Sequence, residues 1–115
     1  MIKVLVCGGR DYADAEPLRR VLEVLAAGNR IHIGHGGARG ADTAAGEIAK
    51  QYNWPVSVYK ADWETHGKAA GVIRNQDMLA DFLPHIVVAC KGGRGTEHMK
   101  SIAIKYGFPV VEVVQ

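Results

Sequence analysis

The chain has 115 residues, of which 48% are hydrophobic and 23% charged, and its formal net charge is +2. This is an ordinary globular composition, which excludes a disordered chain and a protein that coats nucleic acid with a strongly basic surface. The length predicts one domain over residues 1–115.

Apolar runs alternate with segments of helical periodicity along the chain. We predict strands over residues 2–7, 30–34, 55–59, 85–90 and 108–114. Helical spacing of apolar residues predicts helices around residues 18–25, 41–52, 69–82 and 96–106, with residues 60–67 irregular. Tyr52, Val72 and Tyr106 are expected on the inner faces of these helices.

Strands that alternate with helices and are apolar on both faces indicate a parallel sheet covered on both sides. Right-handed crossovers leave few possible topologies. We therefore predict an α/β fold with a doubly wound, parallel, five-stranded sheet in the order 3-2-1-4-5, with helices on both faces.

Three predicted strands end in a Gly-Gly pair, and an arginine follows within two residues. The three stretches are CGGRD (Cys7 to Asp11), HGGARGAD (His35 to Asp42) and KGGRGTEH (Lys91 to His98). The predicted order makes these strands neighbours, so the loops should converge on one crevice beyond the carboxyl ends of the strands.

Glycine lets the backbone approach a ligand closely, and a helix that begins there offers unpaired N–H groups. A single such loop is explained by a tight turn alone, whereas three adjacent loops predict a phosphate site. The candidate ligand-binding residues in the loops are Gly8, Gly9, Arg10, Asp11, Gly36, Gly37, Arg39, Gly40, Asp42, Gly92, Gly93, Arg94, Gly95 and Thr96.

Two of these loop carboxylates and one hydroxyl have alternative roles. A capping role at the start of a helix competes with ligand binding for Asp42, and Thr96 is either a helix cap or a phosphate ligand. Asp11 is either the partner of an arginine or a general base.

The segment after the third strand should lie at the rim of the crevice. Trp63 is placed either to stack on a base or to plug the domain edge or a dimer interface, and Asp62 to accept from a ribose hydroxyl or a base edge. Lys68 and Arg74 are placed to clamp a phosphate, and Asn75 to fix a base or a backbone turn.

The cysteines and histidines set further expectations. Cys7 and Cys90 each end an apolar run, which predicts buried thiols and a reducing compartment. The histidines have no regular ligand spacing, so we expect neither a metal site nor a cofactor. No signal peptide or apolar stretch of membrane-spanning length is found, so we expect a cytoplasmic protein with no membrane partner.

Four stretches together resemble the YspA-like group of the SLOG superfamily. They are GGRDY, GGARGAD, ADWETHGKAAGVIRNQDM and GGRGT, in matching order over residues 1 to about 111. The resemblance implies a Rossmann-like domain that binds a nucleotide or nucleotide derivative. The superfamily also includes LOG-type enzymes, which hydrolyse the N-glycosidic bond of nucleoside monophosphates, and DprA-type DNA-binding proteins.

The resemblance also implies roles for single residues. In the LOG pattern PGGxGTxEE, the phosphate-loop positions correspond to Gly92, Gly93, Gly95 and Thr96, and the pattern RKxxM matches Arg74 and Met78. The two glutamates of the LOG pattern fall on His98 and Met99, and Lys91 replaces its proline. Since that glutamate pair serves the hydrolysis, these departures argue against the same reaction by the same residues. Candidate catalytic residues are then Arg74, Glu97 and Asp62.

Three functions remain open at this point. The first is binding or sensing of a nucleotide-derived small molecule, and the second is LOG-like cleavage of a nucleoside monophosphate. The third is DprA-like binding of single-stranded nucleic acid, against which the near-neutral charge argues. Because LOG-like relatives often pair, we expect a homodimer.

Overall fold

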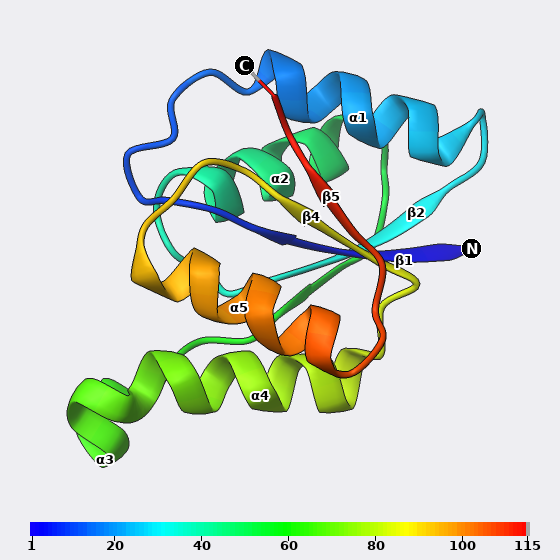
Figure 1. Cartoon of the computed structure of the whole chain (residues 1–115). Coiled ribbons are helices and arrows are strands. Elements are labelled where there is room, and N and C mark those ends of the chain that lie inside the picture. Colours follow the sequence, from blue (N-terminus) through cyan, green and yellow to red (C-terminus); the bar gives the residue numbers. More distant parts are fainter. Residues whose placement is uncertain (115) are drawn as a thin grey trace.

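Five parallel strands form one sheet in the computed structural model, which describes residues 1–114 (Figure 1). The order is β3-β2-β1-β4-β5 and every neighbouring pair is parallel, which confirms the predicted Rossmann-like α/β sheet. The strands are β1 (Ile2–Cys7), β2 (Ile31–His35), β3 (Val56–Val58), β4 (Ile86–Ala89) and β5 (Val110–Glu112).

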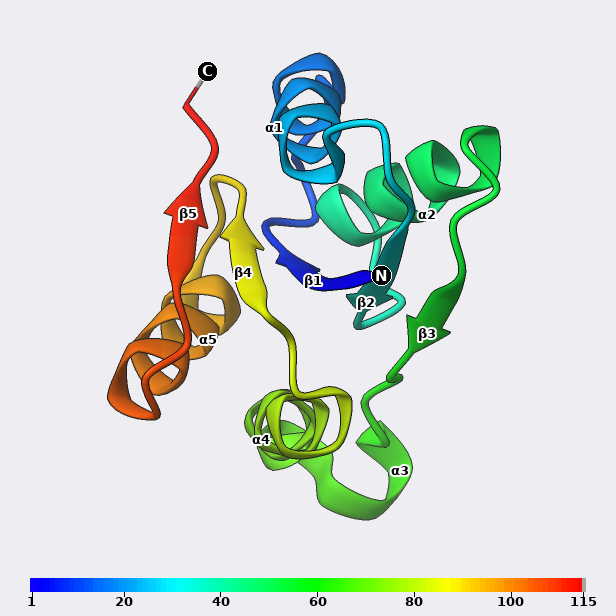
Figure 2. The ribbon, with the colours of Figure 1, turned by 90° about the vertical axis from the view of Figure 1, so that its right-hand side faces the viewer.

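The helices cover both faces of the sheet (Figure 2). On one face lie α1 (Glu16–Ala26) and α2 (Ala41–Gln51), and on the other α4 (Ala70–Phe82) and α5 (Arg94–Lys105). The short α3 (Trp63–His66) and the 3-10 turn η1 (Gly67–Ala69) precede α4 and project from the molecule. Within residues 1–114, no helix is both long enough and apolar enough to cross a bilayer.

Two apolar clusters, one on each face, form the core. Successive residues of β1 point to opposite faces, so Val4 and Val6 pack beside α1 and α2 while Leu5 packs beside α4 and α5. All three side chains are fully buried. Burial on both faces explains why the strand sequences are continuously apolar rather than alternating.

Three side chains predicted on inner helix faces are exposed instead. Tyr52 and Tyr106 are 38% and 65% exposed because each is the C-cap residue that follows the last residue of its helix, α2 or α5. Val72 is 44% exposed and lies in the first turn of α4, next to the projecting α3. The prediction for these three residues was wrong, because helical spacing does not reveal where the sheet stops covering a helix.

The segment over residues 60–67 is also more ordered than predicted. Residues 63–66 form one helical turn, and Asp62 caps it by accepting a hydrogen bond from the backbone N–H of Thr65 at 3.1 Å. Every side chain of the helix is exposed. Four residues are too few to show apolar periodicity, so the pattern could not indicate this turn.

Candidate ligand-binding cleft

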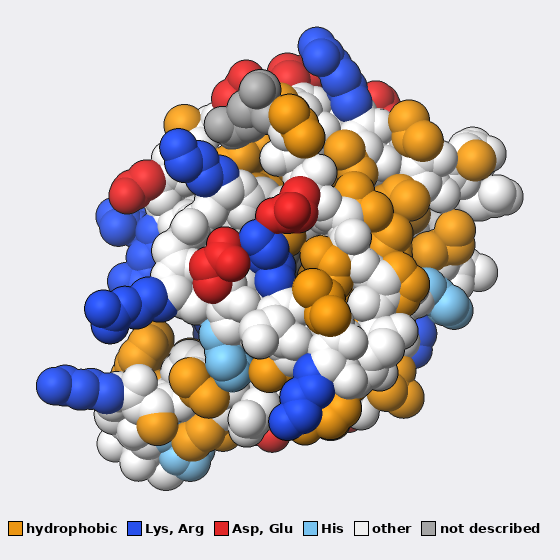
Figure 3. Space-filling view, viewed as in Figure 1, with side chains coloured by type: hydrophobic (Ala, Val, Ile, Leu, Met, Phe, Trp, Pro, Cys, Tyr) orange, Lys and Arg blue, Asp and Glu red, His pale blue; other side chains and the backbone are white. Residues whose placement is uncertain are grey.

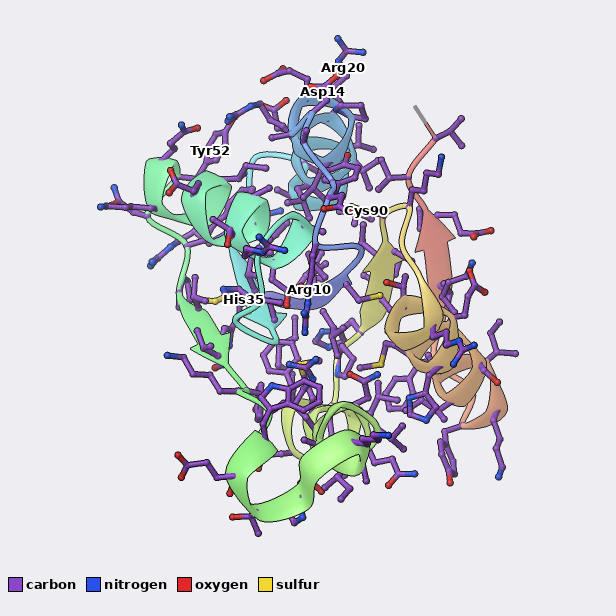
Figure 4. All side chains as sticks on the ribbon, turned by 90° about the vertical axis from the view of Figure 1, so that its left-hand side faces the viewer. Arg10, Asp14, Arg20, His35, Tyr52 and Cys90 are labelled. Carbon is purple, nitrogen blue, oxygen red and sulfur yellow. The ribbon has the colours of Figure 1, made fainter. Side chains whose placement is uncertain are left out.

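The three Gly-Gly loops line one cleft of about 410 Å³ at the carboxyl edge of the sheet. Figure 4 looks onto this edge, with α2 and α5 on either side and α3 and α4 below. The volume is that of a small-molecule site. The loops after β1, β2 and β4 contribute Gly8, Gly9, Gly36, Gly93 and Gly95 to its wall.

Backbone contacts hold the three loops together, with Gly9 at their centre. Its N–H donates to the carbonyl of Lys91 at 2.9 Å, and its own carbonyl accepts from the N–H of Ala41 at 3.2 Å. Gly40 has a φ of +76°, and a Cβ there would overlap the Gly9 carbonyl oxygen. Only glycine at position 40 therefore allows the second loop to lie this close to the first.

Arg74 of α4 joins the loops that follow β2 and β3. Its Nη1 donates to the carbonyls of Gly36 at 2.8 Å and Tyr59 at 3.2 Å, and its Nε donates to Oδ1 of Asn75 at 3.0 Å. Burial lowers the pKa of Arg74, but a guanidinium stays cationic at neutral pH. Its Nη2 donates to none of residues 1–114, which leaves a charged donor for a ligand.

Asn75 joins α4 to the start of α5. The side chain is buried, and its Nδ2 donates to the carbonyl of Gly95 at 3.2 Å and to Nδ1 of His98 at 3.1 Å. Its Oδ1 is occupied by Arg74. Asn75 therefore fixes a backbone turn here, and the bond to His98 assigns the imidazole proton to Nε2.

Asp42 and His35 shape the second glycine loop from within. Oδ2 of Asp42 accepts from the N–H groups of Gly36 and Ala38, both at 3.1 Å, and Nδ1 of His35 accepts from the N–H of Gly37 at 3.0 Å. Burial raises the pKa of Asp42, and the bond from Ala38 opposes that rise. The carboxylate thus binds two N–H groups of the loop that precedes α2. It does not cap α2 itself, because the N-cap position of that helix has no side-chain hydrogen bond.

Two arginines give the cleft positive charge. Arg10 is exposed and points into the open space at the sheet edge (Figure 4), where it lines the cleft together with Arg74. Neither forms an ion pair with another described residue. Burial lowers the pKa of Arg74, the charge of Asp42 opposes that shift, and the charge of Arg10 adds to it, so the two cations repel one another.

The three carboxylates expected near the reacting atoms lie outside this wall. Asp62 caps α3, and its bond from Thr65 lowers its pKa. Glu97 is exposed and paired with Lys100, while Asp11 is exposed in a neighbouring hollow. Asp42 is the only carboxylate among the described residues that line the cleft.

The other candidate residues are distributed around the cleft. Trp63 is 51% exposed and lies in the cleft wall, as does the buried Thr96. Since α5 begins at Arg94, Thr96 lies within its first turn and does not cap it, so that alternative was wrong. Flanking hollows are lined by Gly37, Arg39 and Gly92, whereas Gly40, Lys68 and Arg94 line neither these nor the cleft.

Sequence reasoning missed Lys60, which lies beside Arg39 in one of these flanking hollows. The only feature of the sequence that could have indicated Lys60 is its position directly after the third predicted strand, where a basic residue can reach the crevice. The histidines and carboxylates raise no new candidate, because within residues 1–114 no group of three or more metal-ligating side chains is placed to hold an ion.

Known proteins resemble the chain in sequence and in fold. The profile of the YspA, cpYpsA-related SLOG family (YAcAr) matches residues 2–66, which include the first two glycine loops and Trp63. The Gene 61 protein of Mycobacterium phage D29 is 37% identical over 120 residues, covering 96% of this chain and 95% of that protein.

Among solved structures, the glycotransferase of kitacinnamycin superposes with a TM-score of 0.53 at 11% sequence identity. The match covers 96% of this chain but only 29% of the transferase. At this identity the likeness concerns the fold alone.

Proposed function

Because the chain belongs to the YspA, cpYpsA-related SLOG family, we propose that it binds a nucleotide or nucleotide-derived phosphate ligand in the cleft. One observation carries the proposal: glycine loops from three adjacent strands line one cleft with two arginines that form no ion pair with a described carboxylate. Bare backbone and unpaired cations at a sheet edge suit an anion.

The phosphate is assigned to the loop that begins α5. A Cβ built on Gly93 or Gly95 would meet no atom within 4 Å, so the space beside this backbone is open. The first turn of a twelve-residue helix starts here and presents N–H groups that have no partner within the helix. Its partial positive charge favours a phosphate at this end.

The base is assigned to the side of the cleft near Trp63. The indole is half exposed at the wall and offers an apolar face for stacking. Arg74 lies in the same wall, and its Nη2 donates to none of the described residues, so it is available to a ligand. A nucleotide would then run from Trp63 to the loop at Gly93.

Binding fits the arrangement of acidic groups better than hydrolysis does. Cleavage of an N-glycosidic bond needs a carboxylate beside the ribose. Asp62 caps α3 and Glu97 is paired with Lys100, while Asp11 lies in a neighbouring hollow. Asp42 lines the cleft but already accepts two backbone N–H groups.

Calorimetry with AMP, GMP and adenosine tests the proposal. AMP or GMP should bind, and adenosine, which lacks the phosphate, should bind at least about tenfold more weakly. Arg74→Gln should weaken nucleotide binding by roughly ten- to a hundredfold, since a hydrogen bond to a charged group contributes about 1.5–3 kcal/mol. Arg20→Gln is the matched control, because this exposed arginine lies on α1, outside the cleft wall.

Three outcomes would contradict the proposal. The absence of any nucleotide binding would do so, and so would an equal response of the two arginine variants. Free base released by the wild type, detected by chromatography and lost in Arg74→Gln, would indicate the LOG-like hydrolase. Salt-sensitive retention of single-stranded DNA without any effect of nucleotide would indicate the DprA-like function.

A further inference from the structure

The carboxylate of Asp42 lies in the cleft wall at an edge of the molecule that is otherwise basic. Figure 3 shows that Lys and Arg side chains gather along this edge, at the left of the view, over the carboxyl ends of the strands. A carboxylate placed there repels the phosphate of a ligand, and it loses hydration because only 6% of Asp42 is exposed. Phosphate binding therefore does not account for an acidic residue in this wall.

One oxygen of this carboxylate is used by the protein and the other is not. Oδ2 accepts from the N–H groups of Gly36 and Ala38, both at 3.1 Å, and so holds the loop after β2. Oδ1 accepts from none of residues 1–114 and remains in contact with solvent. Because Asp42 is otherwise buried and lines the cleft, the open side of Oδ1 is the cleft.

The two cations of the cleft wall do not occupy Oδ1. Neither Arg10 nor Arg74 forms an ion pair with Asp42, and Nη1 of Arg74 donates to the carbonyl of Gly36 instead. Burial raises the pKa of Asp42, and the bond from Ala38 opposes that rise. A carboxylate that receives two N–H donors is ionised at neutral pH and then only accepts, so Oδ1 suits a ligand group that donates.

The position of Asp42 along the sheet matches the middle of the proposed ligand. The base is assigned near Trp63, which follows β3, and the phosphate at Gly93, which follows β4. Asp42 follows β2, which lies between these two strands in the order β3-β2-β1-β4. The part of a nucleotide between base and phosphate is the ribose, and its hydroxyls donate without adding a second negative charge.

Resting on the proposed function, we infer that Oδ1 of Asp42 is the acceptor for the 2′,3′-diol of the ribose, while Oδ2 keeps the glycine loop in place. Asp42 is thereby a specificity-determining residue for nucleotides with an intact diol. The contact orients the sugar and transfers no proton. An analogue without the donating hydroxyl leaves a charged acceptor without its ligand partner, which lowers the affinity.

Calorimetry with AMP, 2′-deoxy-AMP and 3′-deoxy-AMP tests this assignment on the wild type. At least one of the two analogues should bind about tenfold more weakly than AMP, which corresponds to about 1.4 kcal/mol. The analogue with fluorine at that same carbon should bind as weakly, because fluorine is close to the hydroxyl in size but cannot donate. This comparison needs no variant and therefore does not depend on how a substitution affects folding.

Asp42→Asn should reduce the preference for AMP over the deoxy analogue to about threefold or less. The amide oxygen of asparagine can keep both loop bonds, while its NH₂ group replaces the free acceptor. The ratio of the two affinities is the readout, because a general distortion of the loop would weaken AMP and its analogue alike. Asp77→Asn is the control, since this exposed carboxylate of α4 lies outside the cleft wall, and it should keep the full preference.

The failures of this inference and of the proposed function are distinguishable. If AMP binds but neither deoxy analogue is weaker by at least about threefold, or if the fluoro analogue binds as tightly as AMP, the diol contact is refuted and the nucleotide cleft stands. A preference that survives in Asp42→Asn, or that is lost in Asp62→Asn instead, refutes the assignment to Asp42. A change in the ratio of GMP to AMP affinity in Asp42→Asn, with the deoxy preference unchanged, would show that the carboxylate contacts the base. If no nucleotide binds, both proposals fall.

Discussion

The guanidinium of Arg74 occupies the space that a side chain on residue 36 would fill. A Cβ on Gly36 would overlap Nη1 and Cζ of Arg74 and would lie 3.1 Å from Oδ2 of Asp42. The same Nη1 donates to the carbonyl of Gly36 at 2.8 Å. The glycine is therefore required by the arginine that packs on it.

Gly36→Ala should displace Arg74 and weaken both the fold and AMP binding. Overpacking of this kind costs about 1–3 kcal/mol of unfolding free energy, which urea denaturation measures. For the stability measurement, Gly95→Ala is the control, because its Cβ would meet no atom within 4 Å and the residue lies in helix α5. There alanine should be neutral or stabilise by up to about 1 kcal/mol. Equal stability of Gly36→Ala and wild type would refute this reading of the contact.

Asn75→Ala should destabilise the start of α5. The substitution removes the acceptor for Arg74 Nε and the donor to the Gly95 carbonyl and His98. Leaving such buried groups unpaired costs about 1–3 kcal/mol, measurable by urea denaturation. The exposed neighbour provides the control, since Gln76→Ala should stay within about 0.5 kcal/mol of wild type. Similar effects of the two variants would mean that the Asn75 bonds contribute nothing.

The sheet and the converging loops could be predicted, because they depend on patterns that are local in the sequence. Continuous apolar strands such as β1 indicate burial on both faces, and Gly-Gly pairs mark where strands end. Strand order then brings those ends together without knowledge of any side chain.

The partners of individual side chains could not be predicted in the same way. Asp42 was expected either to cap its own helix or to bind the ligand, but it accepts from two N–H groups of the loop before that helix, because the loop folds back over the start of α2. The targets of Asn75 lie 20 and 23 residues further along the chain. Such contacts depend on how α4 and α5 pack, which no sequence spacing encodes.

Cys7 and Cys90 should be unreactive in the native protein. Burial raises the pKa of Cys7 to about 12 and that of Cys90 to about 11, so almost no thiolate is present at neutral pH. Iodoacetamide should modify both only after unfolding, as mass spectrometry would show. Ser101→Cys supplies an exposed thiol on α5 as the reactive control. Because Cys7 lies in the cleft wall, labelling as fast as that control would mean that the floor of the cleft opens.

His35 should make stability depend on pH. Its buried Nδ1 accepts from the Gly37 N–H, which requires that nitrogen to be unprotonated. Burial lowers the pKa of His35 below its usual 6.5, while Asp42 opposes the shift and Arg74 adds to it. Between the two pKa values the unfolded chain binds more protons than the folded one. This contribution to stability is therefore complete above pH 6.5 and is lost as the pH falls through the folded pKa.

Urea denaturation at about pH 7.5 and about pH 5.5 measures this loss. Wild type should be less stable at the lower pH, and His35→Asn, whose amide oxygen accepts the same bond but does not titrate, should lose less. His32, whose pKa burial also lowers, accounts for a remaining dependence. His66→Asn is the control at an exposed position and should lose as much as wild type. If His35→Asn and wild type lose the same stability on acidification, the glycine loop after β2 is not held by a neutral imidazole.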